Sequence, residues 1–479
     1  MTEILLKSGL HLPYNLIDVE RVIKDLTWKM KDFTSGEMVE LQGFQERDYD
    51  IVVPRNFPFE KYWDTDNFMD FVQIVDQRSS GREIIDSGKP IIPRNKDQET
   101  FINKIYTELF YNKSAYGVAS CGVGKSFLCI DVIKRYKRST AVIVPTKTIM
   151  DQWVDYLVNG QPEEGVDPAW PECNVGICQG DRCDTGNTHD VVICMIQSLY
   201  SRDYGEEFYN SFGLCVIDEA HKITSPKWNK VIFDFNPKVW LPLTATPERN
   251  DNTHELLYMH TSKPTVIIKN YEVKPKIFGV PIKERYQENY YRWKSKGKKV
   301  FSRARALNKI SVNDVRNDRI AKDIKKAIKE GRKILAIGER HVQFTEIEKR
   351  FADSSFDDFG WLVASKEVPG KRDPEKMVKR QLTKEEEAEA KKCQVVWTTY
   401  QKAEVGMNDS SIDVIIIMNT RAHLEQTVGR STREREGKKQ PIIVIYLDEF
   451  IPEFYYTGVN AIKELEGLGF ETKIIGASK

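Results

Sequence analysis

The chain has 479 residues, of which 40% are hydrophobic and 30% are charged. Because one hydrophobic core rarely serves more than about 250–300 residues, this length predicts two or three domains, and the composition excludes a disordered chain. Lysine plus arginine (72) nearly equals aspartate plus glutamate (71), so overall charge neither favours nor excludes a nucleic-acid partner.

No apolar run approaches the ~18–20 residues that span a bilayer, and the N-terminus lacks the apolar core of a secretion signal. The cysteines do not suggest a disulfide framework, so we expect a soluble, cytoplasmic protein in a reducing compartment. One cluster, Cys173, Cys178, Cys183 and His189, suggests a zinc site. Its gaps do not match the Cys-x-x-Cys spacing of structural zinc sites, which favours ordinary thiols.

Residues 1–88 carry no motif, and only 49–54 resembles a strand, so we expect a small accessory domain that could contact DNA. From about residue 93, short apolar runs alternate with amphipathic stretches, as in βα units of a parallel sheet. We predict strands at 114–119, 140–145, 190–195, 213–218 and 239–244, with helices at 125–137 and 149–158.

A second series of the same kind follows in the C-terminal half. Its predicted strands are 333–338, 360–364, 394–398, 413–418 and 441–447, and its predicted helices are 339–351 and 422–430. The fold class is therefore α/β, with two tandem lobes built on parallel sheets flanked by helices. We predict domains at 1–88 (accessory), 89–270 (first lobe), 271–310 (connector) and 311–479 (second lobe).

Two charged segments lie outside these series. In 283–309, Tyr286, Tyr290 and Trp293 have helical spacing among lysines and arginines. Such a helix could bind nucleic acid, but a buried aromatic stripe with solvated charges is the commoner arrangement and is favoured. The segment 366–392 is expected to be an exposed loop and helix.

A phosphate-binding loop follows the strand at 114–119 and precedes the helix at 125–137. It consists of Ser120, Cys121, Gly122, Val123, Gly124, Lys125 and Ser126. Small residues let backbone N–H groups surround phosphates at a helix N-terminus, Lys125 reaches the β/γ oxygens, and the Ser126 hydroxyl binds magnesium. Ala119 replaces the usual first glycine, a position that tolerates a small side chain. We predict an ATP site.

The segment Asp218, Glu219, Ala220 and His221 follows an apolar strand. This places two carboxylates at the carboxyl end of the strand, where open α/β sheets bind ligands. Asp218 is expected to hold magnesium through water, and Glu219 to act as the general base that polarises the attacking water. A solvated turn is the alternative, and the phosphate loop upstream argues against it.

These motifs resemble those of superfamily 2 helicases and translocases, and the resemblance runs from Gln98 to the end of the chain. Further segments match the family in order: 144–153 (motif Ia), 196–199 (motif Ib), 243–249 (motif III), 397–406 (motif V) and 426–433 (motif VI). Motifs Ia and III look like the XPB/UvsW-like branch, which works mainly on DNA. The layout is similar to helicases of phages and large DNA viruses, which implies a location inside the host cell.

The resemblance implies two RecA-like lobes and assigns further residues. Arg430 and Arg433 would act as arginine fingers on the γ-phosphate, with Gln426 holding the water, while a solvated basic helix end is the alternative. His221, Thr244, Thr246 and Gly406 would couple the ATP site to the nucleic-acid track. The nucleic-acid contacts would be Thr146, Lys147, Gln197, Ser198, Thr399 and Tyr400. As an alternative, these could be turn and cap residues.

Two positions depart from the family pattern. Relatives place an adenine-reading glutamine three residues after an arginine, whereas Arg94 and Gln98 are four apart. Despite this difference, the resemblance assigns the adenine contact to Gln98. Motif V usually has an aspartate two residues after its glycine, and this chain has Asn408 after Gly406. Asparagine can still hydrogen-bond but carries no charge.

These observations predict a monomeric, ATP- and magnesium-dependent DNA helicase or translocase that moves 3′ to 5′ on branched or forked DNA during repair, recombination or replication. Its grip on the backbone would be largely independent of base sequence. One rival is an RNA helicase, because Asp-Glu-Ala-His also occurs in RNA-acting branches. The other is an ATP-driven remodeler or transcription-release factor that acts on DNA without unwinding it.

Overall fold

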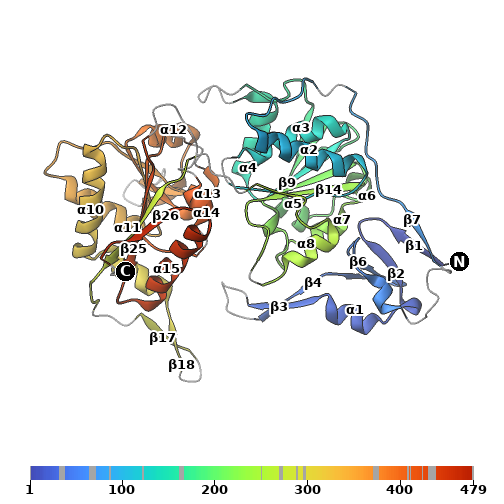
Figure 1. Cartoon of the computed structure of the whole chain (residues 1–479), viewed down its shortest axis with the longest axis horizontal. Coiled ribbons are helices and arrows are strands. Elements are labelled where there is room, and N and C mark those ends of the chain that lie inside the picture. Colours follow the sequence, from blue (N-terminus) through green and yellow to red (C-terminus); the bar gives the residue numbers. More distant parts are fainter. Residues whose placement is uncertain are drawn as a thin grey trace. The chain divides into compact units, whose positions relative to one another are not determined.

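The computed structural model describes residues 2–31, 38–63, 72–85, 88–120, 123–160, 167–249, 251–268, 273–286, 290–294, 298–369, 377–406, 409, 411–422, 424–429 and 439–476. The chain divides into two compact units, Met1–Asn270 and Tyr271–Lys479 (Figure 1). No described helix combines the length and apolar composition of a membrane span.

The first unit begins with a small mixed sheet in the order β5-β6-β2-β1-β7. Its elements, with a separate β3–β4 hairpin, are β1 (Thr2–Leu6), β2 (Leu10–Pro13), α1 (Val19–Asp25), β3 (Thr27–Lys31), β4 (Met38–Gln42), β5 (Gln45–Glu46), β6 (Asp50–Val53) and β7 (Val72–Asp76). The strand expected at 49–54 is thus confirmed as β6. The sheet is tied to the rest of the unit, since Asn56 N–H donates to the Met259 carbonyl (2.8 Å).

The larger sheet of the first unit has eight strands in the order β11-β10-β12-β9-β13-β14-β8-β15. All neighbours are parallel except β10 and β11. Its strands are β8 (Gly117–Ala119), β9 (Thr140–Val144), β10 (Val175–Gln179), β11 (Arg182–Cys183), β12 (Val191–Met195), β13 (Leu214–Asp218), β14 (Val239–Thr244) and β15 (Val266–Ile268). The five strands predicted for this lobe are confirmed.

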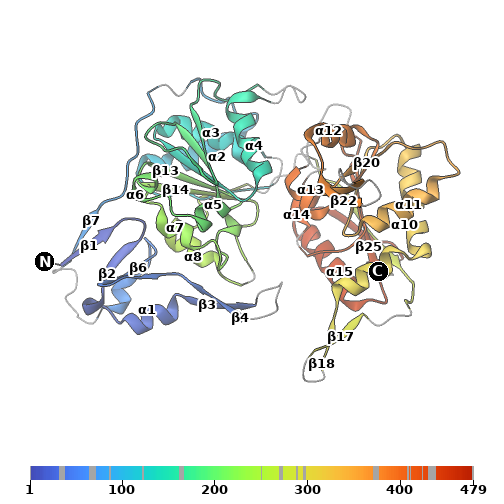
Figure 2. The same cartoon turned by 180° about the vertical axis from the view of Figure 1, so that it is seen from behind.

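Helices cover both faces of this sheet (Figure 2). They are α2 (Lys96–Phe110), α3 (Lys125–Tyr136), α4 (Lys147–Val154), α5 (Ile196–Ser201), α6 (Glu206–Tyr209), α7 (Lys230–Asp234) and α8 (His254–His260). Alternate strand residues point to opposite faces and so belong to two cores. Val216 belongs to the core beneath α2, α3 and α4, and Ile217 to the core beneath α5, α6 and α7. Burial on both faces explains the continuous apolar runs in the sequence.

The second unit contains a seven-stranded sheet in the order β20-β23-β19-β24-β25-β16-β26, with parallel neighbours. Its strands are β16 (Lys276–Ile282), β19 (Ile334–Gly338), β20 (Phe359–Leu362), β23 (Val395–Thr399), β24 (Val414–Ile417), β25 (Ile442–Asp448) and β26 (Glu471–Ile474). Two α/β lobes are therefore present, as predicted. The segment 271–310, expected as a connector, contributes β16 to this sheet.

The helices of the second unit also lie on two faces (Figure 2). They are α9 (Arg303–Ser311), α10 (Asp314–Lys329), α11 (His341–Glu348), α12 (Lys384–Lys392), α13 (Tyr400–Gly406), α14 (Glu425–Val428) and α15 (Pro452–Gly467). Ile320 and Phe344, from α10 and α11, pack with one core, and Ala403 and Ile462, from α13 and α15, pack with the other.

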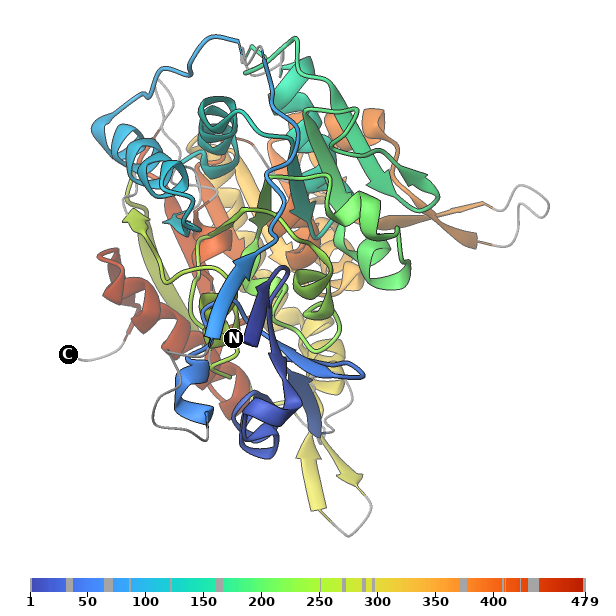
Figure 3. The ribbon, with the colours of Figure 1, turned by 90° about the vertical axis from the view of Figure 1, so that its right-hand side faces the viewer.

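Two hairpins replace expected helix or loop in the second unit. The aromatic stretch 283–309 was expected to be one helix, and that prediction is wrong: the chain forms β17 (Tyr291–Lys294) and β18 (Lys298–Phe301) before α9 (Figure 3). The favoured packing of its aromatics is confirmed for Tyr290, which is 9% exposed and packs on Phe454. Within 366–392, β21 (Ser365–Pro369) and β22 (Met377–Gln381) precede α12.

Candidate nucleotide-binding site

The candidate site lies at one edge of the eight-stranded sheet. Strands β8, β9, β12, β13 and β14 are parallel, so their carboxyl ends share this edge, where ligands of open α/β sheets bind. The phosphate loop follows β8, Asp218 ends β13 and Thr244 ends β14. The register thus gathers motifs that are far apart in the sequence.

The phosphate loop turns from β8 into α3. Gly124 caps the helix in the left-handed region (φ 86°), a conformation that costs glycine little. Lys125 Nζ donates to the Ala119 carbonyl (3.0 Å), which folds its chain back over the loop. The Ser120 side-chain oxygen is buried and has no hydrogen-bond partner among the described residues. Cys121 and Gly122, also predicted for the loop, lie outside the described residues.

Asp218 meets the phosphate loop directly. Its side chain is buried, and Oδ2 accepts hydrogen bonds from Ser126 Oγ (3.0 Å) and Trp153 Nε1 (2.8 Å). Oδ1 accepts from the Glu219 N–H (2.9 Å). Burial, followed by the charge of Glu219, raises the pKa of the Asp218 carboxyl above its usual value, although Trp153, Lys125 and Ser126 oppose the shift. The two residues predicted to hold magnesium therefore lie in hydrogen-bond contact.

Glu219 continues the turn in the left-handed region (φ 53°), a conformation uncommon outside glycine that often marks a functional site. Its Oε2 atom is buried and accepts no hydrogen bond, while the His221 ring nitrogen lies 3.5 Å away. Burial, helped by nearby Lys222, Arg249 and Lys125, lowers the pKa of His221 to about 3. The imidazole is therefore neutral at physiological pH.

His221 connects the Asp218 turn to β14. Its Nδ1 lies 2.9 Å from Thr244 Oγ1, and the Thr246 N–H donates to the same oxygen (3.1 Å). Arg249 Nη1 donates to the His221 carbonyl (2.8 Å) and also forms an ion pair with Asp251 (2.7 Å). Hydrogen bonds thus connect the three predicted coupling residues of the first lobe, through the side chains of His221 and Thr244 and the backbone of Thr246.

Gln98 lies on α2 beside the phosphate loop. Its Oε1 accepts from the Arg94 N–H (2.8 Å), and its Nε2 donates to the Val123 carbonyl (2.9 Å). The side chain is 6% exposed. The i,i+4 spacing that departs from the family pattern thus still places an amide at the loop, where it anchors Val123.

The predicted nucleic-acid contacts of the first lobe follow β9 and β12. Thr146 caps α4 by accepting from the Ile149 N–H (3.3 Å), and Lys147 pairs with Asp151 (2.7 Å). Gln197 Nε2 donates to the Pro145 carbonyl (2.7 Å), and Ser198 Oγ accepts from the Gly180 N–H (3.0 Å). Turn and cap roles are therefore filled by at least Thr146 and Ser198.

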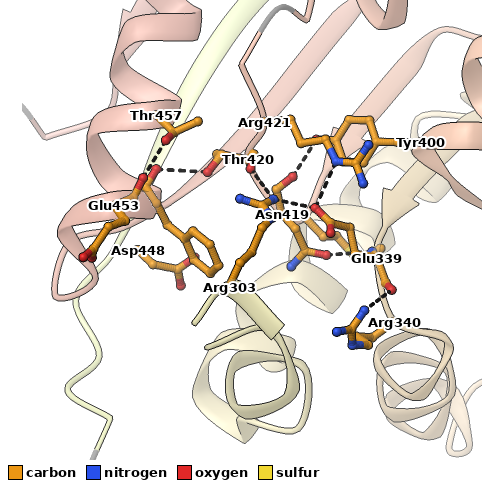
Figure 4. Close-up of polar contacts among 12 residues, drawn as sticks. Arg303, Glu339, Arg340, Tyr400, Asn419, Thr420, Arg421, Asp448, Glu453 and Thr457 are labelled. Carbon is orange, nitrogen blue, oxygen red and sulfur yellow. Dashed lines mark hydrogen bonds and ion pairs between the residues drawn. The ribbon is translucent and has the colours of Figure 1, made fainter. Parts of the chain in front are cut away.

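In the second unit, polar groups gather at the carboxyl ends of β19, β23 and β24 (Figure 4). Glu339 accepts hydrogen bonds from Arg303 (2.5 Å) and Arg421 (3.2 Å), whose charges hold the pKa of its carboxyl below the usual value against the opposing effect of burial. Thr399 ends β23. Tyr400 is 1% exposed, and its hydroxyl donates to the Asn419 carbonyl (2.5 Å), so its side chain serves packing within the second unit.

Several predicted residues of motifs V and VI cannot be placed. Gly406 ends α13. Gln426 lies in α14, and its side chain is outside the described set. Arg430 and Arg433 lie outside the described residues, as does Asn408. Their roles stay predictions.

Trp153 and Arg249, which end motifs Ia and III, make contacts that the motifs did not predict. Trp153 is fully buried, and its indole N–H binds the central carboxylate. A buried tryptophan needs a partner for its N–H, which was the available signal in the sequence. The partner itself is set by tertiary structure.

The residues present fit a magnesium ion. Mg²⁺ prefers oxygen ligands and uses one or two protein groups beside water and phosphate oxygens. Ser126 and Asp218 supply such oxygens, and the orphaned Glu219 Oε2 leaves a buried acceptor beside them. Elsewhere in the described part of the chain, no group of three His, Cys, Asp or Glu side chains is arranged to hold a metal.

Comparison with known proteins agrees with this site. Residues 91–249 match the family model described as "Type III restriction enzyme, res subunit". A protein of Acanthamoeba polyphaga mimivirus, named as an ATP-dependent RNA helicase, is 22% identical over 91% of this chain and 79% of its own length. The chain is thus similar to superfamily 2 helicases. Its resemblance to helicases of large DNA viruses is likewise confirmed.

Two further relatives match a smaller part of this chain. A protein of African swine fever virus (strain Badajoz 1971 Vero-adapted), also named as an ATP-dependent RNA helicase, is 33% identical over 35% of the chain and 32% of that protein. The DNA 3′-5′ translocase XPB2 of Sulfurisphaera tokodaii is 28% identical over 29% of the chain and 28% of that protein. The chain thus spans only about a third of these two proteins.

Among solved structures, a variant of S. cerevisiae Dbp5 bound to RNA and ADP BeF3 has a similar fold. The TM-score is 0.50 at 11% identity, and the match covers 81% of this chain and 89% of that chain. At this identity the likeness concerns the fold alone, and it confirms the two RecA-like lobes.

Proposed function

We propose that the protein uses the energy of ATP hydrolysis to move 3′ to 5′ on DNA and to unwind branched or forked substrates. The observation that carries the proposal is the contact between Ser126 and Asp218, which joins the phosphate loop to the carboxylate turn. A hydroxyl and a carboxylate at this distance from each other suit the metal end of a nucleoside triphosphate.

Each residue of the site has a proposed task. Lys125 swings from the Ala119 carbonyl to the β/γ oxygens, and loop N–H groups hold the phosphates. Magnesium, held by Ser126 and Asp218, would supply positive charge against that of the phosphates. Glu219 accepts a proton from the attacking water through its unpartnered Oε2.

Coupling to the track would run through the Asp218–His221 turn and motif III. The neutral His221 ring shares a hydrogen bond with Thr244. A shift of the carboxylate turn would therefore move Thr244 at the end of β14. Arg430, Arg433 and Gln426 would complete hydrolysis from the second unit, and Gly406 would transmit the change there. Alternating grip by the two lobes on the phosphate backbone then gives directional steps.

DNA is preferred because motifs Ia and III resemble the DNA-acting branch and because the Sulfurisphaera relative is named a DNA 3′-5′ translocase. RNA is the second candidate, since the mimivirus and African swine fever virus relatives are named RNA helicases. ATPase assays with matched single-stranded DNA, forked DNA and RNA distinguish the two. Stimulation by DNA, largest with the fork, is expected, and stimulation by RNA alone would contradict the proposal.

Strand separation needs its own assay. A fork with a fluorophore on one strand and a quencher on the other should brighten when ATP is added. A 5′ single-stranded tail in place of a 3′ tail is the matched control for polarity. ATP turnover on DNA without any strand separation would instead favour the remodeler or transcription-release role.

A further inference from the structure

Two cysteines face each other across the hairpin formed by β10 and β11. Cys178 is paired with Cys183 in the antiparallel register, next to Gln179 and Arg182, which close the two-residue turn. On the other side, the Asp184 N–H donates to the Ile177 carbonyl (3.2 Å). Because hydrogen-bonded and non-hydrogen-bonded pairs alternate in such a ladder, the cysteines occupy a non-hydrogen-bonded pair.

This position suits a disulfide. Directly opposed residues of a non-hydrogen-bonded pair have Cα atoms about 4.5 Å apart, with side chains on the same face. Disulfides span Cα separations of about 4.4–6.8 Å, so the bond could close with little backbone movement.

The surroundings make the two thiols unequal. Cys178 is fully buried, whereas Cys183 is partly exposed. Hydrogen bonding with Cys194, assisted by Tyr204 and Cys183, lowers the pKa of the Cys178 thiol despite its burial, whereas burial and the neighbouring Cys178 raise the pKa of the Cys183 thiol to about 12. Access, and not acidity, therefore decides which thiol a reagent reaches first. A small reagent thus meets Cys183 first, and Cys178 stands beside it as the resolving thiol.

We propose that Cys178 and Cys183 form a reversible redox modification site that closes to an intrachain disulfide with small disulfides such as oxidised glutathione. Cys183 sulfur attacks the reagent, forms a mixed disulfide and releases one glutathione. Cys178 sulfur then attacks the Cys183 sulfur and releases the second. Two protein thiols are oxidised, one small disulfide is reduced, and the two departing thiolates take up the two protons.

A third cysteine, Cys194, is an alternative partner for Cys178. Cys194 lies opposite Cys178 on the neighbouring parallel strand β12, but it is fully buried and its thiol donates to the Val192 carbonyl (3.5 Å). The partly exposed Cys183 therefore reacts with the reagent before the buried Cys194 can.

Closure would fix a hairpin that touches the predicted track. Its turn residue Gly180 donates its N–H to Ser198 (3.0 Å) and accepts from the Tyr204 hydroxyl (2.7 Å). The modification itself is independent of the proposed activity, because its readout is covalent.

Peptide mapping tests the site on the full chain. Trypsin cuts after Arg182, between the two cysteines, so a disulfide holds residues 148–182 and 183–202 together. After treatment with oxidised glutathione and alkylation, mass spectrometry should find this linked pair, reducing agent should separate it, and fragmentation should place the bond at Cys178 and Cys183.

Three variants make the result decisive. The linked pair should disappear in Cys183→Ser, and in that variant no residue of the hairpin should carry glutathione. The pair should persist in Cys194→Ala and in the control Cys393→Ser. Absence of the linked pair from the wild type, under conditions that modify the partly exposed Cys393, would overturn the proposal. So would a linked pair that persists in Cys183→Ser and is lost in Cys194→Ala.

Discussion

Two buried carboxylates end strands of the two sheets, and their surroundings differ. Asp448, at the end of β25, is 2% exposed and binds the guanidinium of Arg316 through Nε (2.8 Å) and Nη2 (3.2 Å). It also accepts from the Tyr286 hydroxyl (2.9 Å). Asp218, at the end of β13, is 6% exposed, and among the described residues its carboxylate accepts from Ser126, Trp153 and the Glu219 backbone.

The difference separates a structural charge from a functional one. A buried charge is costly unless it is paired, and Asp448 has its cation within the fold. Asp218 has neutral donors and lies beside a second carboxylate, Glu219, so its charge awaits a cation from outside. The same residue type thus serves packing in one unit and, we propose, metal binding in the other.

The largest expected effect comes from Asp218→Asn. The amide keeps the shape but loses the charge that would hold magnesium, so kcat for ATP hydrolysis should fall about 10²–10³-fold, the size typical of losing one preorganised electrostatic group. Thermal unfolding should show no loss of stability, because repulsion with Glu219 is relieved. A variant that retains activity would remove Asp218 from the site.

Arg316→Met should have the largest effect on stability. It leaves Asp448 buried without its cation, and breaking such a pair costs about 3–5 kcal/mol of unfolding free energy, measurable by urea denaturation. The matched control is Arg319→Met, in the same helix, whose more exposed pair with Asp323 should contribute about 0.5 kcal/mol. Equal losses in the two variants would refute the comparison.

Thr244→Val removes the hydroxyl that meets His221 and Thr246. One lost hydrogen bond of about 1–1.5 kcal/mol predicts a roughly tenfold smaller stimulation of ATPase by nucleic acid, with basal hydrolysis little changed. Thr261→Val is the control, since its buried hydroxyl donates to the backbone carbonyls of Leu257 (2.8 Å) and Ser262 (3.5 Å) and takes no part in the His221–Thr244 contact. A basal rate that falls as far as the stimulated rate would point to catalysis rather than coupling.

The last prediction concerns the pH dependence of stability. His260 is fully buried against Phe233, and burial lowers its pKa to about 3. The unfolded chain takes up a proton below about pH 6.5 and the folded chain does not, so stability falls as pH drops from 6.5 toward 3, by up to about 1.4 kcal/mol per pH unit. His260→Leu should flatten this slope between pH 6.5 and 5, measured by urea denaturation. An unchanged slope would contradict the burial argument.

The sequence predicted the strands best where burial on both faces leaves a continuous apolar run, as in β13 and β25. It missed β16 as a sheet strand because Gly279 and Pro281 are unfavourable in strands. The structure explains the glycine, since a Cβ there would lie 2.8 Å from Ile462 Cδ1. Helical spacing in 283–309 was misleading because a short aromatic pattern also fits a hairpin.

At the site, the sequence predicted Ser126 and Asp218 because each follows a strand within a recognisable motif. It could not predict that Trp153 would bind Asp218 or that Gln98 would anchor Val123, since these contacts depend on how separate elements pack. Local patterns name the groups that carry chemistry, and tertiary packing decides their partners.

The most direct test of the central claim is ATP hydrolysis by Lys125→Ala, with the exposed Lys104→Ala as control. Loss of the ammonium that would reach the β/γ oxygens should reduce nucleic-acid-stimulated hydrolysis to background while the control keeps wild-type activity. Hydrolysis by Lys125→Ala at the wild-type rate would contradict the assignment of this loop as the ATP site.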